Sequence, residues 1–546
     1  MDWKSISQAR RKLAQEQGTI CKDWGGRIPI ALAYPNTYRI GMSNLGLHVI
    51  YRLLNEQPYI VCERVFYDKY DSPPMSLESQ RPMAEFAVLA FTVSFEMDYF
   101  NLLTMLRQAG IPLPSEERDE GYPLLIAGGP CVMANPEPLA PIFDAFVIGE
   151  GEAVVPTLSK TLWEGIDGNR EEVLRRLAAV PGVYVPRFYR IEREDDHILR
   201  VRPSAGLPYP VQRQWPSDLD SHPATSVIMT EETEFGDMYL IEVARGCHRG
   251  CHFCLAGFTY LPVRERSPKT LLVQAREGLR YRRKLGLIGA CLSDYSHIEE
   301  LVAGLRDLGA EISVASLRVD PLPEALLRAL VESRVQTLTI APEAGSERLR
   351  RKIRKGISRE DIIHAAELAA LYDFPRLKLY FMVGLPTETD DDASQIVDLV
   401  QAVRKRFRRR LAVNITPFVP KAQTPFQWMA MAPLDVLEGR LHYIKSNLRS
   451  MGVEIKAESS RWAQVQSILA RGDRRVGKAL MTVEKKSLTA WRRALEEQGL
   501  RAEFYLGNLS KDEILPWATV SAGTGYCSPT GIGVRQSRQK VAKETV

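Results

Sequence analysis

The sequence predicts an α/β fold: an N-terminal doubly wound (Rossmann-like) parallel sheet, then a partial (β/α)6 TIM-type barrel, then a small mixed C-terminal region. Three observations predict it. Short apolar runs alternate with helical stretches in both halves of the chain, a pattern typical of parallel sheets covered by helices. In the first half most of these runs end on glycine, as strands do where a ligand binds beyond them. The composition, 45% hydrophobic and 25% charged over 546 residues, is that of a folded globular protein.

Four apolar runs predict the strands of the N-terminal sheet, which follows a polar helix over residues 1–19. The runs cover residues 28–34, 86–94, 123–130 and 145–152. We expect this domain to span residues 20–185, with a charged, proline-containing connector over 186–236. Because ligands of such sheets bind beyond the carboxyl ends of the strands, four residues at those ends are candidate contacts. They are Ser94, Gly128, Gly129 and Gly149.

Six further apolar runs predict the partial barrel, which we expect to span residues 237–455. The runs cover residues 238–244, 287–293, 311–318, 335–343, 376–386 and 411–420, and helical stretches separate them. In barrels of this type the chemistry takes place on the loops that follow the strands. Beyond residue 455 the pattern weakens into a basic C-terminal extension over 456–546.

Three of the eight cysteines, Cys247, Cys251 and Cys254, follow the first of these strands with the spacing Cys-x3-Cys-x2-Cys. Clustered thiols outside a disulfide scaffold are typical of metal sites or catalysis. A structural zinc needs four ligands, which His248 or His252 could complete, but zinc ligands usually come as two separated pairs. A 4Fe–4S cluster held by three thiolates keeps one iron open for substrate chemistry. The spacing therefore favours a working iron–sulfur cluster, with zinc as the alternative.

This cysteine motif after the first barrel strand, with the aromatic Phe253 before the last cysteine, resembles the radical S-adenosylmethionine superfamily. The resemblance implies an enzyme whose three thiolates hold a 4Fe–4S cluster, with S-adenosylmethionine on the fourth iron. It implies that one electron cleaves this cofactor to methionine and a 5′-deoxyadenosyl radical, which abstracts a hydrogen atom. It also implies a flavodoxin- or ferredoxin-type electron donor.

Four later segments match the family's cofactor contacts: "LSDYS", "SLRVD", "APEAGSERLR" and "FMVGLPTET". They correspond to the turn for the amino group, the contact with ribose or carboxylate, the next strand end and the segment along the adenine. Arg318 could instead form a salt bridge within the barrel, and Glu343 could cap a helix. The residues that the resemblance assigns to the cofactor, besides Phe253, are Ser293, Asp294, Ser316, Arg318, Glu343, Leu385 and Pro386.

The N-terminal sheet resembles the cobalamin-binding domain of one class of this superfamily, chiefly in "LLIAGGP" and "AFVIGEGEAVV". The usual cobalt-ligating histidine is missing: in "GMSNLG" (41–46) Ser43 stands in its place. His48 is out of register and is predicted to be a helix-face residue. We therefore expect either cobalamin without a protein histidine ligand, or a domain that has kept the fold and not the cofactor.

Three functions are consistent with the sequence. The first is cobalamin-dependent methylation of an unactivated carbon; the second is a radical modification or rearrangement without cobalamin, with RNA as one candidate substrate. The third is a non-catalytic, metal-containing nucleic-acid-binding protein. Residues 401–500 suggest RNA, because they contain 20 Lys and Arg but 8 Asp and Glu. No apolar run is long enough to span a membrane and no secretion signal is recognised, so we expect a cytoplasmic protein.

The other five cysteines give weaker expectations. Four of them, Cys21, Cys62, Cys131 and Cys291, lie in or near apolar runs and are predicted to be small core residues. Cys527, in "GTGYCSPTG", is predicted to be a loop residue, with a second catalytic thiol as the alternative.

Overall fold

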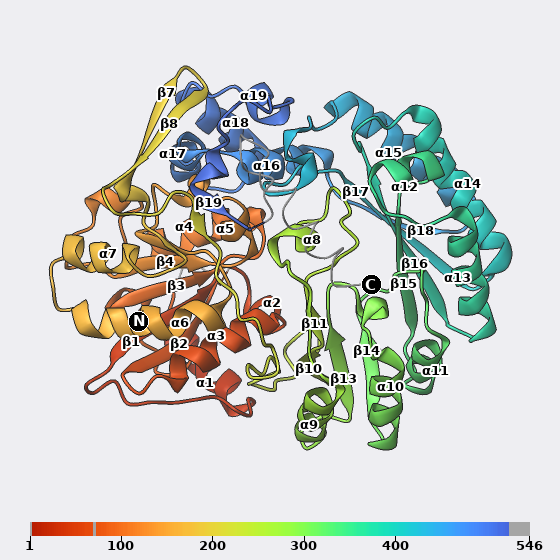
Figure 1. Cartoon of the computed structure of the whole chain (residues 1–546), viewed down its shortest axis with the longest axis horizontal. Coiled ribbons are helices and arrows are strands. Elements are labelled where there is room, and N and C mark those ends of the chain that lie inside the picture. Colours follow the sequence, from red (N-terminus) through yellow and green to blue (C-terminus); the bar gives the residue numbers. More distant parts are fainter. Residues whose placement is uncertain (1–2, 69–72, 524–546) are drawn as a thin grey trace, which may run out of the picture.

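The computed structural model describes residues 3–68 and 73–523, and it places two α/β units side by side (Figure 1). The first unit is a six-stranded sheet with the order β2-β1-β3-β4-β5-β6, in which only the pairing of β5 with β6 is antiparallel. Its strands are β1 (Ile28–Tyr34), β2 (Ile60–Phe66), β3 (Val88–Thr92), β4 (Leu124–Gly128), β5 (Ala145–Val147) and β6 (Val183–Tyr184). The doubly wound sheet that the sequence predicts is therefore confirmed.

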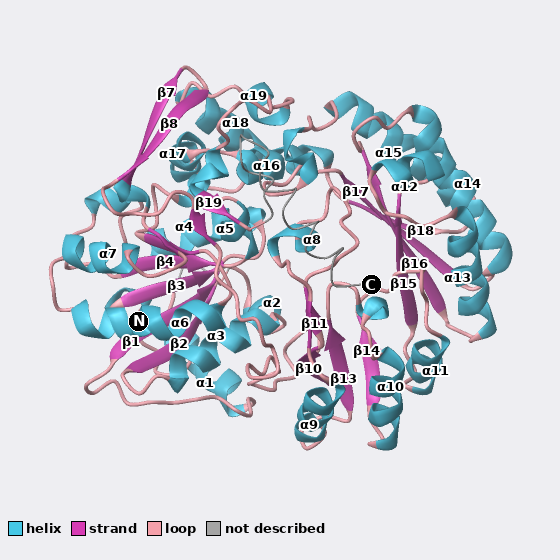
Figure 2. Cartoon of the chain, viewed as in Figure 1, coloured by secondary structure: helices cyan, strands magenta, loops and turns pink. Residues whose placement is uncertain are grey.

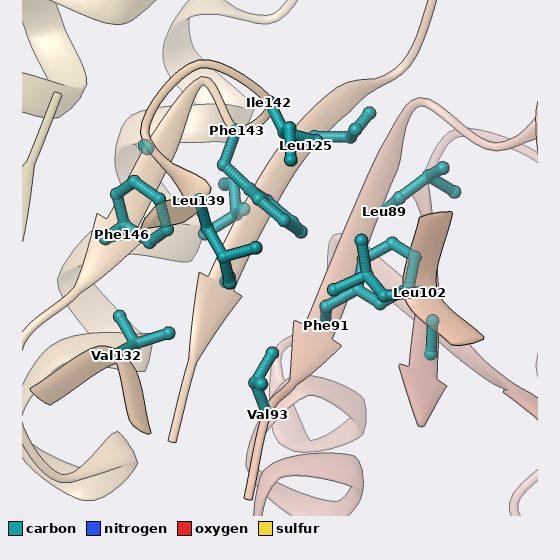
Figure 3. Close-up of a cluster of buried hydrophobic side chains, with 14 of the residues drawn as sticks. Leu89, Phe91, Val93, Leu102, Leu125, Val132, Leu139, Ile142, Phe143 and Phe146 are labelled. Carbon is teal, nitrogen blue, oxygen red and sulfur yellow. The ribbon is translucent and has the colours of Figure 1, made fainter. Parts of the chain in front are cut away.

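Apolar side chains bury both faces of this sheet. Leu102 and Phe143 pack on one face, over Leu89 and Phe91 of β3 and Leu125 of β4 (Figure 3). The helices of this unit are α1 (Trp3–Ala14), α2 (Tyr38–Gly41), α3 (Leu45–Glu56), α4 (Tyr99–Gln108), α5 (Pro130–Ala134), α6 (Gly151–Gly165) and α7 (Arg170–Ala178). Burial of this apolar area is the main force that holds the layers together.

Strand β2 has no counterpart among the predicted strands. Its sequence, "IVCERVF", places two charged residues in the middle of the run. Both are buried, and Arg64 forms ion pairs with Glu16 at 2.6 Å and Glu78 at 2.7 Å. Burial of a charge is tolerated only when it is paired, and the partners come from elsewhere in the chain.

The second unit is an open barrel of parallel strands with helices along its outer side (Figure 2). Its strands are β10 (Met238–Glu242), β13 (Lys284–Ile288), β14 (Glu311–Val314), β15 (Thr337–Glu343), β16 (Arg376–Val383), β17 (Arg410–Pro417) and β18 (Glu454–Ala457). A bridge between Leu317 and Ile340 joins the first three strands to the last four. The partial barrel is confirmed, with β18 added: "EIKA" is too short and polar to predict a strand.

The outer helices of the barrel are α9 (Pro268–Gly278), α10 (Ile298–Asp307), α11 (Glu324–Glu332), α13 (Arg359–Leu371), α14 (Asp390–Arg406) and α15 (Leu434–Arg449). In the chain segment that links the two units, β7 (Tyr189–Glu194) and β8 (His197–Pro203) form a hairpin within the predicted connector. Among residues 3–68 and 73–523, no helix is long and apolar enough to cross a membrane.

The C-terminal region folds back onto the first unit. Its helices are α16 (Ser460–Arg471), α17 (Arg474–Thr482), α18 (Leu488–Glu497) and α19 (Ala502–Leu506). Ile468, Val476 and Trp491 belong to the same buried cluster as the core of the N-terminal sheet. The last described strand, β19 (Val520–Ser521), pairs with β9 (Val211–Gln212) of the connector. The chain therefore returns to the N-terminal sheet after completing the barrel.

Candidate active site at the cysteine loop

The loop that carries the three cysteines leaves β10 at the carboxyl end of the barrel strands. It is closed by a short antiparallel pair, β11 (Ala244–Arg245) with β12 (Arg264–Glu265). Gly246 has a φ of +86°, and a Cβ at this position would lie 2.6 Å from the Tyr260 carbonyl oxygen, so only glycine fits. The loop continues into α8 (Ala256–Thr259) after a hydrogen bond of 3.0 Å from the Cys254 N–H to the Cys251 carbonyl.

The three thiols lie near one another but in different surroundings. Burial raises the pKa of both Cys251 and Cys254, and the negative charge of the neighbouring cysteines raises each further. The Cys291 side chain next to Cys247 lowers the pKa of Cys247 to about 6. Metals bind the thiolate, so Cys247 is the thiol most ready to bind one at neutral pH.

The donor set fits an iron–sulfur cluster better than a zinc ion. Among the described residues, no three His, Cys, Asp or Glu side chains converge as the ligands of a single metal ion must. A 4Fe–4S cluster has a wider requirement, because each thiolate binds its own iron. Three neighbouring thiols on one loop, at the open end of a barrel, meet this requirement of one thiolate for each of three irons.

Two of the predicted cofactor contacts lie beside these thiols. The positive charges of Lys355 and Arg318 act on Cys251 and partly offset the effect of its burial, and the charge of Glu343 acts on it as well. Glu343 forms an ion pair with Lys355 at 3.1 Å, and Arg318 forms one with Asp320 at 2.8 Å. Both side chains are thus held in place by partners. Glu343 also has a φ of +68°, in the left-handed region that few residues other than glycine adopt.

The turn over residues 292–296 is tied to the cysteine loop. The Ser293 hydroxyl accepts the Arg318 N–H at 3.2 Å, and Asp294 forms an ion pair of 2.5 Å with Arg249. Burial opposes ionisation of Asp294, but Arg249 outweighs this effect, so the pKa of Asp294 lies below its usual value. Ser316 is exposed next to this group. The structure therefore gathers the predicted residues around one loop, and their contact with a cofactor stays a prediction.

Apolar residues also pack against the cysteine loop. Phe253 packs with Leu385 in a small buried cluster that includes Phe418 and Phe426, and Pro386 is half-buried beside it. The backbone before Leu385 is fixed by Glu388, which accepts the Gly384 N–H at 2.5 Å. Sequence reasoning missed Glu388, although an acidic residue soon after a Gly-Leu-Pro turn is a signal that could have found it.

The expectations for the remaining cysteines are met in part. Cys62 and Cys131 are buried, as predicted. Cys21 is exposed and Cys291 is half-buried next to Cys247, so the prediction that these two are core residues is wrong. The apolar run around Cys291 ends before that residue, because β13 stops at Ile288. Cys527 lies outside the described residues.

The carboxyl edge of the N-terminal sheet contains the four residues predicted to contact a ligand. Ser94 accepts a hydrogen bond of 3.2 Å from the Asn44 amide, and the nearest atom to a Cβ placed on Gly128 would be 3.7 Å away. Gly129 and Gly149 have a different reason to be glycine. A Cβ on Gly129 would lie 2.6 Å from the Val93 carbonyl oxygen, and one on Gly149 would collide with the backbone next to it. Of these three glycines, only Gly128 has space for a Cβ.

His48 lies in α3, as the sequence suggested, on the buried face of that helix. Its Nε2 lies 3.0 Å from the Met42 carbonyl oxygen, and its Nδ1 accepts the Val227 N–H at 3.2 Å. Burial lowers the pKa of His48 to about 4. Ser43 donates to the Arg39 carbonyl and accepts the Glu234 N–H. Both ring nitrogens of His48 are therefore occupied by protein groups, which leaves neither free to bind cobalt.

A buried ion-pair network joins the edge of the N-terminal sheet to the cysteine loop. Glu150, directly after Gly149, accepts hydrogen bonds from Arg213 at 3.1 Å, Arg245 at 2.7 Å and Arg264 at 2.6 Å. Arg245 and Arg264 belong to the strands that open and close the cysteine loop. Sequence reasoning missed this network, because its members are far apart in the chain and resemble ordinary surface charges.

Apolar contacts reinforce this junction. Helix α5 at the sheet edge contacts α8 of the cysteine loop. Ala134 of α5 and Leu255 of the loop pack in one cluster with Trp517, which is fully buried and donates from Nε1 to Gln427 at 2.7 Å. Residues from three distant parts of the sequence thus meet between the sheet edge and the cysteine loop.

Known proteins show similarity to both units. A family model described as "Radical SAM proteins, N-terminal" matches residues 46–186, and one described as "Radical SAM superfamily" matches residues 241–400. The uncharacterised protein MJ0966 of Methanocaldococcus jannaschii is 33% identical over 454 residues, which cover 83% of this chain and 90% of that protein.

More distant relatives cover part of the chain. A tRNA-2-methylthio-N(6)-dimethylallyladenosine synthase of Pelotomaculum thermopropionicum is 23% identical over 43% of this chain and 54% of that protein. An uncharacterised methyltransferase of Pyrococcus horikoshii, PH0819, is 23% identical over 54% of this chain and 59% of that protein. Among solved structures, the cobalamin-dependent S-adenosylmethionine radical enzyme OxsB with bound aqua-cobalamin aligns with 95% of this chain and 82% of its own. Its TM-score is 0.48 and its sequence identity is 12%.

Proposed function

Because the chain belongs to the radical S-adenosylmethionine superfamily, we propose that it is a cobalamin-dependent enzyme that methylates an unactivated carbon. One observation carries the proposal: the carboxyl edge of the N-terminal sheet lies directly against the cysteine loop, through Glu150 and through the contact of α5 with α8. A group bound at that edge would face the open end of the barrel. The methyltransferase among the distant relatives agrees with this proposal.

The barrel side supplies the radical. With a 4Fe–4S cluster and S-adenosylmethionine bound, the site provides one electron that yields methionine and a 5′-deoxyadenosyl radical. In this proposal Cys247, Cys251 and Cys254 hold the cluster, which the Arg318 and Lys355 charges help to compensate. Phe253 and Leu385 form the apolar wall that keeps water away from the reacting atoms.

The sheet side fits a corrinoid in part. At the edge, Gly128 has space for a Cβ and the Ser94 hydroxyl accepts a hydrogen bond from Asn44, whereas Gly129 and Gly149 are packed against backbone. Neither Ser43 nor His48 offers an imidazole to cobalt, so the corrinoid would be held without a protein histidine. When bound, such a group supplies a methyl group that sulfonium chemistry cannot give to a carbon radical. The role of this chain is then to hold donor and acceptor on opposite sides of one junction.

The test is metal, sulfide and corrinoid analysis of protein purified and reconstituted without oxygen, followed by paramagnetic resonance of its cobalt(II) form. The proposal expects an iron–sulfur cluster, bound corrinoid and no nitrogen splitting from a protein histidine. Gly128→Ala should reduce corrinoid retention, whereas Gly439→Ala, on an open face of α15, should not. Failure of any corrinoid to bind at micromolar concentration would contradict the proposal and favour a radical modification without cobalamin.

The basic residues of 401–500 give little structural support to the prediction that RNA is the substrate. Arg409 and Arg410 form ion pairs with Asp373 and Glu454 at 2.5 and 2.8 Å. Arg471 is buried and donates to two backbone carbonyls. Much of the positive charge is thus bonded to partners within the fold, and RNA as a substrate stays a prediction.

A further inference from the structure

The short helix α12 (Glu347–Lys352) and the turn after it lie directly against the cysteine loop. The His252 N–H donates to the Ile353 carbonyl at 3.0 Å, and Ile353 is buried in the cluster that contains Phe253. On the next residue, the guanidinium of Arg354 would be 3.4 Å from a Cβ placed on Gly250. Any molecule that docks on this turn therefore docks over the backbone that carries the thiols.

The basic residues of this segment divide into two groups. Arg350 and Lys355 are buried, and they bond to backbone carbonyls and to a carboxylate. Arg351, Lys352 and Arg354 are exposed, and we call these three residues the basic rim. In the described part of the chain, Arg351 pairs only within its own helix, and Lys352 and Arg354 have no ion-pair partner. Arg350 and Lys355 thus form bonds within the fold, whereas the basic rim faces solvent.

Three acidic residues close to the cysteine loop do not cancel this charge, because each of the three already has a basic partner. Asp294 is paired with Arg249, and Glu343 with Lys355. Asp320 is paired with Arg318 at 2.8 Å. The basic rim therefore keeps its positive charge, and it favours an approaching molecule with a negative surface.

We infer that the basic rim is the docking surface for an acidic protein that carries a one-electron cofactor and reduces the cluster. This inference rests on the proposed function, because a cluster that cleaves S-adenosylmethionine must receive one electron from outside the chain. The donor loses that electron and the cluster gains it, and no bond forms or breaks at the surface. Electron transfer weakens steeply with distance, so the donor must dock close to the cysteine loop.

The experiment compares two charge reversals of equal size. Lys352→Glu/Arg354→Glu reverses the basic rim, and Lys405→Glu/Arg408→Glu reverses two exposed cations near the amino ends of the barrel strands. Cluster reduction is followed by stopped-flow absorbance, with a reduced acidic flavodoxin and, separately, with photoreduced deazariboflavin. The first variant should lower the second-order rate constant with flavodoxin about tenfold at low salt and weaken its salt dependence. Reduction by deazariboflavin should be unchanged, and the control variant should behave like the wild type.

Three results would overturn this inference. Equal flavodoxin rates in the wild type and the rim variant, with clusters of normal iron content, would refute it and leave the proposed function intact. Weakened binding of unfractionated tRNA by the rim variant, with flavodoxin reduction unaffected, would make the rim a nucleic-acid surface instead. A wild-type protein that assembles no iron–sulfur cluster would contradict the proposed function itself, and the inference would fail with it.

Discussion

The neighbouring thiols differ in the segment of the chain from which each one comes. Cys247, Cys251 and Cys254 belong to one loop, while Cys291 comes from the next strand–helix connection and interacts with Cys247 and Asp294. Alanine at any of the three loop positions should abolish cluster assembly, because each thiolate holds one iron. Iron and sulfide content after anaerobic reconstitution measures this, together with reductive cleavage of S-adenosylmethionine.

Cys291→Ala is the matched control for this series. It removes a neighbouring thiol without removing a proposed ligand, so the iron content should stay at the wild-type value. Loss of iron in this variant would show that the ligand set is wrong. Full cleavage by any of the three loop variants with an intact cluster would contradict the assignment of the site.

Glu388 makes the stability of the folded protein depend on pH, and the direction of this dependence follows from its raised pKa. Burial raises its pKa to about 7, although the Gly384 N–H and Arg440 act in the opposite direction. The folded protein therefore binds more protons than the unfolded chain between the ordinary value of 4.5 and about pH 7. The stabilisation that protonated Glu388 gives the folded protein is complete below pH 4.5, and it is lost as the pH rises through 7. It amounts to at most about 3 kcal/mol.

The measurement is the urea midpoint of the wild type and of Glu388→Gln at several pH values from 5 to 8. The wild type should lose stability relative to the variant as the pH rises, because glutamine does not titrate. Parallel curves across this range would show that Glu388 does not titrate there.

At the scale of elements, the network around Glu150 couples a corner of the N-terminal sheet to the hairpin that closes the cysteine loop. Glu150→Gln leaves Arg213, Arg245 and Arg264 with a weakened common partner in a buried site. Removing one charged partner of a buried ion pair lowers the free energy of unfolding by about 3–5 kcal/mol. We expect a clear fall in the urea midpoint and a broadened paramagnetic spectrum of the reduced cluster.

Glu152→Gln is the comparison for this prediction. Glu152 is equally buried but bonds to Arg245 alone, and Arg245 keeps Glu150 and Glu242 as partners. Its replacement should lower the midpoint less than Glu150→Gln and leave the cluster spectrum nearly unchanged. Equal effects of the two variants would argue against Glu150 as the centre of the network.

At the scale of the whole molecule, Trp517 joins three distant parts of the chain. It is fully buried with Ala134 at the sheet edge and Leu255 of the cysteine loop. Trp517→Ala should destabilise the protein by about 3–5 kcal/mol, because it leaves a cavity at the junction and removes a buried hydrogen bond. Urea denaturation measures this. Trp3→Ala, at a site 72% exposed, should cause little change.

The fold was largely predictable because apolar runs are local features. Strand β1 begins and ends where its apolar run does, and each of the six predicted barrel runs overlaps a strand, although the run 287–293 shares only its first two residues with β13. Strands β2 and β18 were missed, because their charged residues find partners only in the folded chain. Arg64 of β2 pairs with Glu16, and Glu454 of β18 pairs with Arg410. Charge pairing between distant residues leaves no pattern in a local stretch of sequence.

By itself, the sequence determined the α/β architecture and the three-cysteine loop, because the spacing of side chains along the chain carries both. The tertiary structure alone decided what surrounds that loop. It brought Arg318 and Glu343 beside the thiols, buried His48 with both ring nitrogens hydrogen-bonded, and filled the space at Gly149 with neighbouring backbone. Burial and the pairing of charges depend on residues that only folding brings together. For this reason, a motif can name the chemistry of a site but cannot show which of its neighbours are free to take part.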